Sequence, residues 1–211
     1  MLAVAACTLP PRAATAPQPL QPPPSTVAEL AAAIELDAQR SDHETDSQIR
    51  RTLAAEANAD ADACMALAPQ ATACMYGRAV ALGLNARVHP TRANEYLTSM
   101  LDALARAESA DAVYDEAGPA RVRALVLIRA PGWPLGPGDA DAGLAAARRA
   151  VQLRPNYPPN QLALAEALAK TGDADGALQI YARARDAALA LPESADRKQW
   201  LHEADQGLQR R

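Results

Sequence analysis

The stretch Gly138-Asp139-Ala140-Asp141-Ala142-Gly143-Leu144 returns almost unchanged as Gly172-Asp173-Ala174-Asp175-Gly176-Ala177-Leu178, at a separation of 34 residues. The same interval separates Ala150 from Ala184, two small residues further along each copy. A period of this length is typical of tandem units in which two antiparallel helices stack against the next pair. We therefore predict stacked helical hairpins, an architecture that usually binds other molecules rather than transforming them.

The composition extends the helical prediction to the rest of the chain. Of the 211 residues, 49% are hydrophobic but only 3% are aromatic, and phenylalanine is absent. An alanine-rich sequence of this kind favours closely packed helices, whereas sheet cores are usually rich in β-branched and aromatic residues. The length suits one buried core. We expect one all-α domain, a short superhelix of antiparallel hairpins, over residues 25–211.

The charge distribution argues against a nucleic-acid partner. The formal net charge is −4, and no cluster of basic residues alternates with aromatic ones. Proteins that bind nucleic acid typically concentrate lysine and arginine on one surface. Nor does any stretch approach the roughly 18 apolar residues that a membrane-spanning helix needs. A membrane contact is therefore expected only through a lipid anchor.

Residues 1–24 carry a candidate anchor and a tether. Val4-Ala5-Ala6-Cys7 resembles the lipobox at which bacterial lipoprotein precursors are cut before a lipidated cysteine. Only six residues precede Cys7, fewer than an apolar signal segment needs. Seven prolines follow between residues 9 and 24, a composition typical of semi-rigid spacers. We predict a periplasmic lipoprotein held at Cys7 to a bacterial membrane, the outer one; the alternative is an ordinary disordered tail.

Cap and proline signals divide the domain into helices. Ser25 and Thr26 offer the first N-cap, and Ser41 and Asp42 are expected to restart the chain. The expected helices are about 26–39, 45–67, 70–86, one capped by Thr91, 120–129, 139–154, two more before Pro192, and 194–209. Two segments interrupt the pattern, Tyr114–Pro119 and the long loop Ala130–Gly138.

The cysteine pair of the domain allows two interpretations. Cys64 and Cys74 lie five residues on either side of Pro69, where two antiparallel helices are expected to meet. Such a turn brings the two thiols toward one another, and an exported protein can oxidise them to a disulfide. Equally, both are small side chains that pack well among alanines as buried fillers. No histidine accompanies them, so the pair does not indicate zinc.

These features together resemble known families. The hairpin units are similar to tetratricopeptide repeats, and the chain from about Ala61 onward resembles the tetratricopeptide-like T component associated with TRAP transporters, the tripartite ATP-independent periplasmic carriers. The similar segments are Cys74–Ala79, Leu82–Leu84, Tyr114-Asp115, Gly118-Pro119, Ala130–Gly136, Pro155–Leu168 and Trp200-Leu201. The resemblance implies a helical periplasmic lipoprotein with a central cleft that acts with a solute-binding protein. Arg78 departs from the family pattern, which has an apolar residue there.

Several residues near the first interruption are candidates for binding. Tyr114 and Asp115 could exchange hydrogen bonds with a small polar solute, and Arg78 and Arg121 could together hold a carboxylate. Tyr76 completes this candidate set. Alternatively, Asp115 pairs with an arginine across the turn and serves only the architecture.

Trp133 and Asn160 are the remaining candidates. Trp133 stands between Pro131 and Pro134 in the long loop. It either contacts a ligand or partner, as tryptophan often does at interfaces, or fills the gap left by a shortened helix. The surrounding prolines and glycines favour a fixed fold-back over a mobile lid. Asn160 lies on the helix that lines the concave face in such stacks, and we expect it, rather than Glu166, to point inward.

No catalytic motif is present. Asp139-Ala140-Asp141 and Asp173-Ala174-Asp175 mimic the start of a calcium loop, but Ala150 and Ala184 stand where the bidentate glutamate is required, so we interpret both as helix caps. His202-Glu203 lacks the second histidine of a zinc protease. We predict a non-enzymatic protein without cofactor or metal, whose cleft binds a periplasmic solute-binding protein, another envelope protein or a small organic solute. The alternative is a scaffold for envelope assembly without a small ligand.

Overall fold

The computed structural model describes residues 24–209. Within this range the chain is all α-helical, with no β-strand. The helices are α1 (Val27–His43), α2 (Ser47–Leu67), α3 (Thr72–Val88), the 3-10 turn η1 (Pro90–Arg92), α4 (Ala93–Ala110), α5 (Tyr114–Arg129), α6 (Ala140–Leu153), α7 (Pro158–Lys170), α8 (Ala174–Leu189) and α9 (Ala195–Gln209). The all-α prediction is confirmed. None of these helices is both long enough and apolar enough to cross a bilayer.

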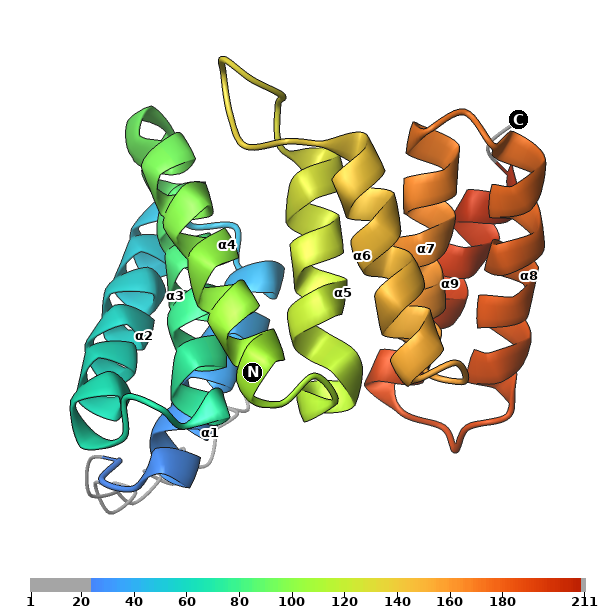
Figure 1. Ribbon diagram of the computed structural model, residues 1–211. Helices are drawn as coiled ribbons and strands as arrows, with labels where there is room; N and C mark the ends of the chain where they lie inside the picture. The colour runs from blue at the N-terminus through green and yellow to red at the C-terminus, as the bar shows by residue number, and fades with distance from the viewer. Residues whose placement is uncertain (1–23, 210–211) are drawn as a thin grey trace, which may run out of the picture.

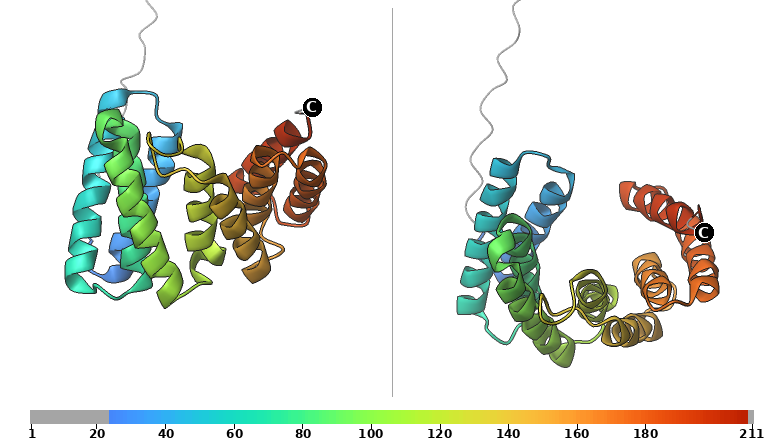
Figure 2. Two further views of the ribbon diagram at one scale, coloured as in Figure 1. Left: turned by 45° about the horizontal axis from the view of Figure 1, so that its top comes forward. Right: turned by 90° about the horizontal axis from the view of Figure 1, so that it is seen from above.

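Successive helices lie antiparallel and pack side by side, so that the chain builds an arc (Figure 1). Seen from above, the arc runs from α1 and α2 through α5 to α8 and α9, and it curves around a hollow (Figure 2). α1 packs on both α2 and α3, whereas α9 packs on α7 and α8. The hollow is therefore bounded at one end by α1 and at the other by α9.

Small buried side chains let neighbouring helices approach closely. Ala150 and Ala184, the equivalent positions of the 34-residue repeat, are 0% and 1% exposed. Gly143 in α6 lies so close to α5 that an added Cβ would stand 2.7 Å from the Ile128 side chain. Because each alanine buries little area, the core depends on many close backbone approaches rather than on a few large side chains.

The repeated Gly-Asp-Ala-Asp stretches begin helices. Asp139 accepts a hydrogen bond from the Ala142 amide at 3.0 Å, and Asp173 accepts one from the Gly176 amide at 2.9 Å. Each carboxylate thus satisfies an amide at the positive end of a helix dipole. Thr26 does the same for α1, where its side chain and that of Glu29 form a reciprocal capping box.

Two expected boundaries are wrong. The chain does not restart at Ser41 and Asp42, because Ser41 is 3% exposed on the packed face of α1 and the helix continues to His43. Thr91 does not cap the next helix either. It lies inside η1, and α4 begins at Ala93 without a side-chain cap.

The interruption expected at Tyr114–Pro119 is a left-handed turn at the start of α5. Asp115, Glu116 and Ala117 have φ values of 47°, 54° and 67°. Residues other than glycine rarely adopt this region, and each such residue costs about 1–3 kcal/mol. Three in succession persist only where surrounding contacts hold them in place, and those contacts lie at the edge of the hollow.

Candidate functional site

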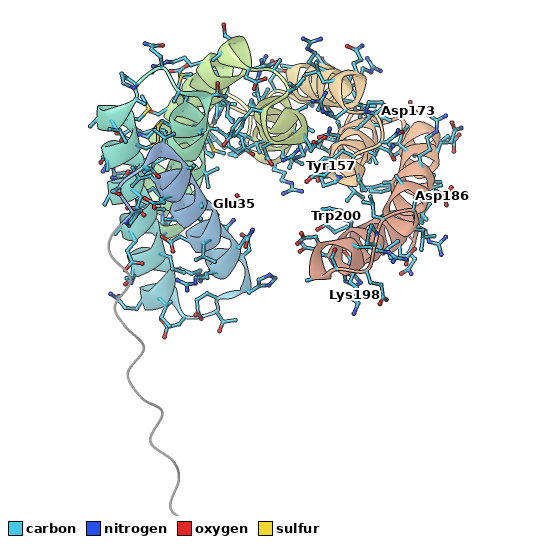
Figure 3. All side chains as sticks on the ribbon, turned by 90° about the horizontal axis from the view of Figure 1, so that it is seen from below. Glu35, Tyr157, Asp173, Asp186, Lys198 and Trp200 are labelled. Carbon is cyan, nitrogen blue, oxygen red and sulfur yellow. A yellow bond between two sulfur atoms is a disulfide. The ribbon has the colours of Figure 1, made fainter. Side chains whose placement is uncertain are left out.

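The inner side of the arc contains a cavity of about 580 Å³ between α1, α5, α7, α8 and α9. Figure 3 shows Glu35 of α1, Tyr157 before α7 and Trp200 of α9 around this space. Its lining comes from helices at the two ends and the middle of the chain, so it exists only because the stack curves. We call it the central cavity.

A second cavity of about 770 Å³ lies between α1, α3 and α5. Its walls are mainly small and apolar, including Ala28, Ala31, Ala73 and Val80. The two cavities share the residues Glu35, Gln39, Asp42 and Asp115. They therefore form one continuous concave surface with an apolar part toward α3 and a polar part toward α9.

The central cavity is acidic. Its carboxylates are Glu35, Asp42, Asp115, Glu166, Asp196 and Glu203, whereas its cationic side chains are Arg121 and Arg129. The two arginines are already committed, since Arg121 pairs with Asp115 at 2.7 Å and Arg129 pairs with Glu166 at 2.6 Å. The contact of Arg129 with Glu166 is bidentate and raises the pKa of Arg129. Asp42 pairs in turn with Arg87 at 2.7 Å, so Glu35, Asp196 and Glu203 are the carboxylates that give the surface its excess of negative charge.

Aromatic rings line the same cavity. Trp200 meets Tyr157 edge to face, with ring centroids 5.7 Å apart. The Arg121 guanidinium also lies over Tyr157, 5.2 Å from the centroid of its ring. Tyr157 thus joins α5 to α9 across the cavity floor, and both rings are only half-buried. They offer apolar area beside the carboxylates.

A network of hydrogen bonds fixes the left-handed turn where the two cavities meet. Asp115 accepts from the Tyr76 hydroxyl at 2.9 Å and from Arg121 at 2.7 Å. Arg121 also donates to the Asp115 and Glu116 carbonyls. Asn160, which is fully buried, donates to the Glu116 carbonyl at 2.9 Å. Burial, together with the Asp115 carboxylate, holds the pKa of Tyr76 above its usual range, so its hydroxyl stays a donor.

The structure thus gathers five predicted site residues into one cluster, namely Tyr76, Tyr114, Asp115, Arg121 and Asn160. The Tyr114 ring packs edge to face on Tyr76 at 5.4 Å. Asp115 pairs with Arg121, as one of the two interpretations expected, and its side chain also lines both cavities. Asn160 does not face the concave surface as expected: it is fully buried, and its amide donates to the backbone carbonyls of Glu116, Ala150 and Arg154.

Two predicted residues lie away from the cavities. Arg78 does not join Arg121, because it pairs with Asp62 at 2.7 Å and with Asn58, both on α2. Trp133 does not fill a gap between helices, since it is 90% exposed at the tip of the α5–α6 loop. Glu166, expected to face away, lines the central cavity.

The residues that sequence reasoning missed belong to the two ends of the arc. Glu35 and Asp42 in α1 face Asp196 and Glu203 in α9 across the hollow. The repeat pattern contains no signal for this arrangement, because the approach of the ends depends on the curvature accumulated over the whole stack. The aromatic character of Trp200 was the one available hint.

Two further predictions concern the cysteines. The structure joins Cys64 and Cys74 in a disulfide that links α2 to α3. Both cysteines are also fully buried beside Leu30 of α1. Cys7, the predicted lipidation site, lies outside the described residues. Among residues 24–209, no group of three side chains is arranged to bind a metal ion.

Comparison with known proteins agrees with this architecture. Residues 135–194 match the family model described as tetratricopeptide repeat. Among solved structures, the chain is similar to a thermophilic TPR protein of Thermus thermophilus, with a TM-score of 0.56 and 23% identity over 85% of this chain and 92% of that one. No curated protein matches the chain. The protein therefore has a tetratricopeptide-like helical-repeat fold, a class that generally serves protein–protein interaction.

Proposed function

We propose that this chain is a non-enzymatic binding protein whose concave surface holds a basic segment of a partner protein. The observation that carries the proposal is the charge of the central cavity: three of its six carboxylates are paired with arginines, and Glu35, Asp196 and Glu203 remain to face a ligand. Opposite charges across an interface guide association and suppress wrong partners. Lysine or arginine side chains of the partner would meet Glu35 on one side and Asp196 and Glu203 on the other.

The same charge disfavours a small organic acid as the ligand. A carboxylate would have to displace Asp115 from Arg121 or Glu166 from Arg129, and it would enter a surface that repels it. The Tyr157 and Trp200 rings instead provide area for the aliphatic stems of long cationic side chains or for their charged heads.

We further propose an envelope location. The supporting features are the lipobox-like Val4–Cys7 sequence, the proline-rich tether and the Cys64–Cys74 disulfide, which persists in oxidising compartments. A periplasmic solute-binding protein of a TRAP-type transporter is the partner implied by the sequence resemblance. A scaffold for other envelope proteins would use the same surface.

A peptide titration tests the proposal. The chain is titrated calorimetrically with a short peptide of alternating lysine and serine, and with its glutamate-serine counterpart. We expect binding of the basic peptide only, with affinity falling as salt is added. Glu203→Lys should weaken binding about five- to tenfold, because it exchanges an attraction of about 0.5–0.7 kcal/mol for a repulsion of similar size.

Asp186→Lys provides the matched control. Asp186 is an exposed acid of α8 that lies away from the hollow, so its reversal changes the net charge equally without touching the cavity (Figure 3). Equal losses for Glu203→Lys and Asp186→Lys would show that only the overall charge matters and would reject the cavity as the binding surface. Binding of the acidic peptide would reject the proposal altogether.

A further inference from the structure

The loop between α5 and α6 presents two exposed apolar side chains. Trp133 is 90% exposed and Leu135 is 77% exposed, the highest values among the large hydrophobic residues of the described chain. In Figure 1 this loop, drawn in yellow, projects beyond the α3–α4 and α7–α8 turns at the same end of the molecule. It would touch a flat surface before either neighbour does.

The loop is held in one shape by its own backbone. Leu135 and Gly136 donate their amides to the Gly132 carbonyl at 3.0 and 3.2 Å, and the Gly138 amide donates to Pro131 at 2.9 Å. The chain closes so tightly at Gly138 that any side chain there would collide with the Ala130 and Pro131 carbonyls. The fixed fold-back expected from the sequence is therefore present, and it presents Trp133 outward.

The loop is also suited to a medium that offers no hydrogen bonds. Residues 130–138 contain no charged side chain, and Pro131, Pro134 and Pro137 carry no amide hydrogen. Three further amides are bonded inside the loop. Moving backbone amides into a lipid environment is costly unless they are satisfied internally, and here most of them are absent or satisfied. A protein partner could itself accept hydrogen bonds from free backbone amides, so it would not require a loop with so few of them.

We propose that Trp133 and Leu135 insert into the interfacial region of a lipid bilayer and orient the domain with its α5–α6 end on the membrane. Tryptophan favours this region because its ring is apolar and its N–H can remain hydrated. The charged residues that flank the loop are engaged at its base: Arg129 pairs with Glu166, and Asp139 caps α6. Neither therefore brings a charge to Trp133 and Leu135. No cationic residue of the loop attracts anionic lipid, so the contact depends on apolar insertion.

The proposed lipid anchor is compatible with this orientation. α1 begins at the opposite end of the helices from the loop (Figure 1). A connecting chain therefore has to run the length of a helix, which for the 17 residues of α1 is about 25 Å. The chain from Cys7 to Pro24 can span up to about 60 Å when extended. Anchoring at Cys7 thus leaves the loop able to face the same membrane.

The composition allows a direct test. Trp133 and Trp200 are the two tryptophans, so Trp200→Phe leaves Trp133 as the fluorescent reporter, and Trp200→Tyr serves the same purpose. Cys7 is the one cysteine outside the disulfide, so it can be coupled to a maleimide lipid in zwitterionic phosphatidylcholine vesicles. With bromine on the acyl chains, we expect Trp133 emission to shift to the blue and to be quenched, and Leu135→Ser to remove most of the quenching.

Trp133→Phe is the matched control, because it leaves Trp200 in the central cavity as the reporter. We expect Trp200 emission to be unchanged by the brominated lipid. Quenching of Trp133 no greater than that of Trp200 would overturn the proposal, and so would a Trp133 shift that appears with a protein partner but not with vesicles. Neither result depends on the binding of a basic peptide in the cavity.

Discussion

Removing the Asn160 amide should destabilise the fold strongly, because this side chain makes four hydrogen bonds in the interior. Asn160 is fully buried, and its Nδ2 donates to the carbonyls of Glu116, Arg154 and Ala150 at 2.9, 3.2 and 3.3 Å. Its Oδ1 accepts from Arg121 at 3.2 Å. Asn160→Ala therefore removes four hydrogen bonds at once, three from its Nδ2 and one to its Oδ1.

The expected loss follows from these contacts. Each hydrogen bond lost costs about 0.5–1.5 kcal/mol, and four are lost together. The substitution also removes the support for the Glu116 carbonyl, within a turn whose left-handed residues store strain. We expect the free energy of unfolding to fall by about 3–5 kcal/mol, a large part of the about 5–15 kcal/mol typical of a domain. Urea denaturation followed by circular dichroism measures it.

Asn85→Ala is the control for this prediction. Asn85 is also a buried asparagine, 9% exposed, but it donates only to the Ala81 and Ala54 carbonyls, at 2.9 and 3.4 Å. Asn85 therefore loses two hydrogen bonds on substitution, where Asn160 loses four. We expect a loss of about 1–2 kcal/mol. If Asn160→Ala cost no more than Asn85→Ala, the network around the left-handed turn would not hold the stack together as argued.

Three further predictions concern stability. Gly207→Ala should destabilise by about 1–3 kcal/mol and loosen α9, because its Cβ would lie 2.5 Å from the Tyr181 ring; thermal melts check this. Reducing the Cys64–Cys74 disulfide should lower the melting temperature, by an amount corresponding to about 2–3 kcal/mol, whereas Cys64→Ser should be insensitive to reductant. Burial raises the pKa of Asp37 above its ordinary 3.8, so stability should rise as the pH falls through the raised pKa toward 3.8, and Asp37→Asn should flatten this rise and increase stability at neutral pH.

The fold was accessible from the sequence because its determinants are local. The 34-residue period, the aspartate caps and the small residues at Ala150 and Ala184 each act within one or two neighbouring helices. The structure places all of them as the pattern predicted. The helix boundaries predicted at Ser41 and Thr91 were wrong. At both positions the residue type suggests an N-cap, but packing with neighbouring helices places the residue inside a helical segment.

The candidate site was only partly accessible, because its contacts join distant positions. Tyr76 and Asp115 are 39 residues apart, as are Arg121 and Asn160. Their residue types indicated a polar cluster, but not which arginine would take part. Arg78 follows the same chemical logic as Arg121, yet the phase of α3 turns it toward α2.

Neither the left-handed turn nor the acidic cavity could be predicted from the sequence. No glycine occupies positions 115–117, so nothing in the sequence indicated positive φ there. Glu35 and Glu203 look like ordinary surface acids of amphipathic helices. They become part of one site only when the curvature of the stack brings the first and last helices to face each other.

The open side of the arc gives the protein a mechanical property. Within residues 24–209, the backbones of α1 and α9 do not pack against each other, and the two helices are connected through the helices between them. Small rotations between neighbouring helix pairs therefore add up, and together they change the separation of α1 and α9. A ligand that contacts both α1 and α9 draws the two ends together. Its binding free energy then includes the cost of deforming each helix–helix contact between them.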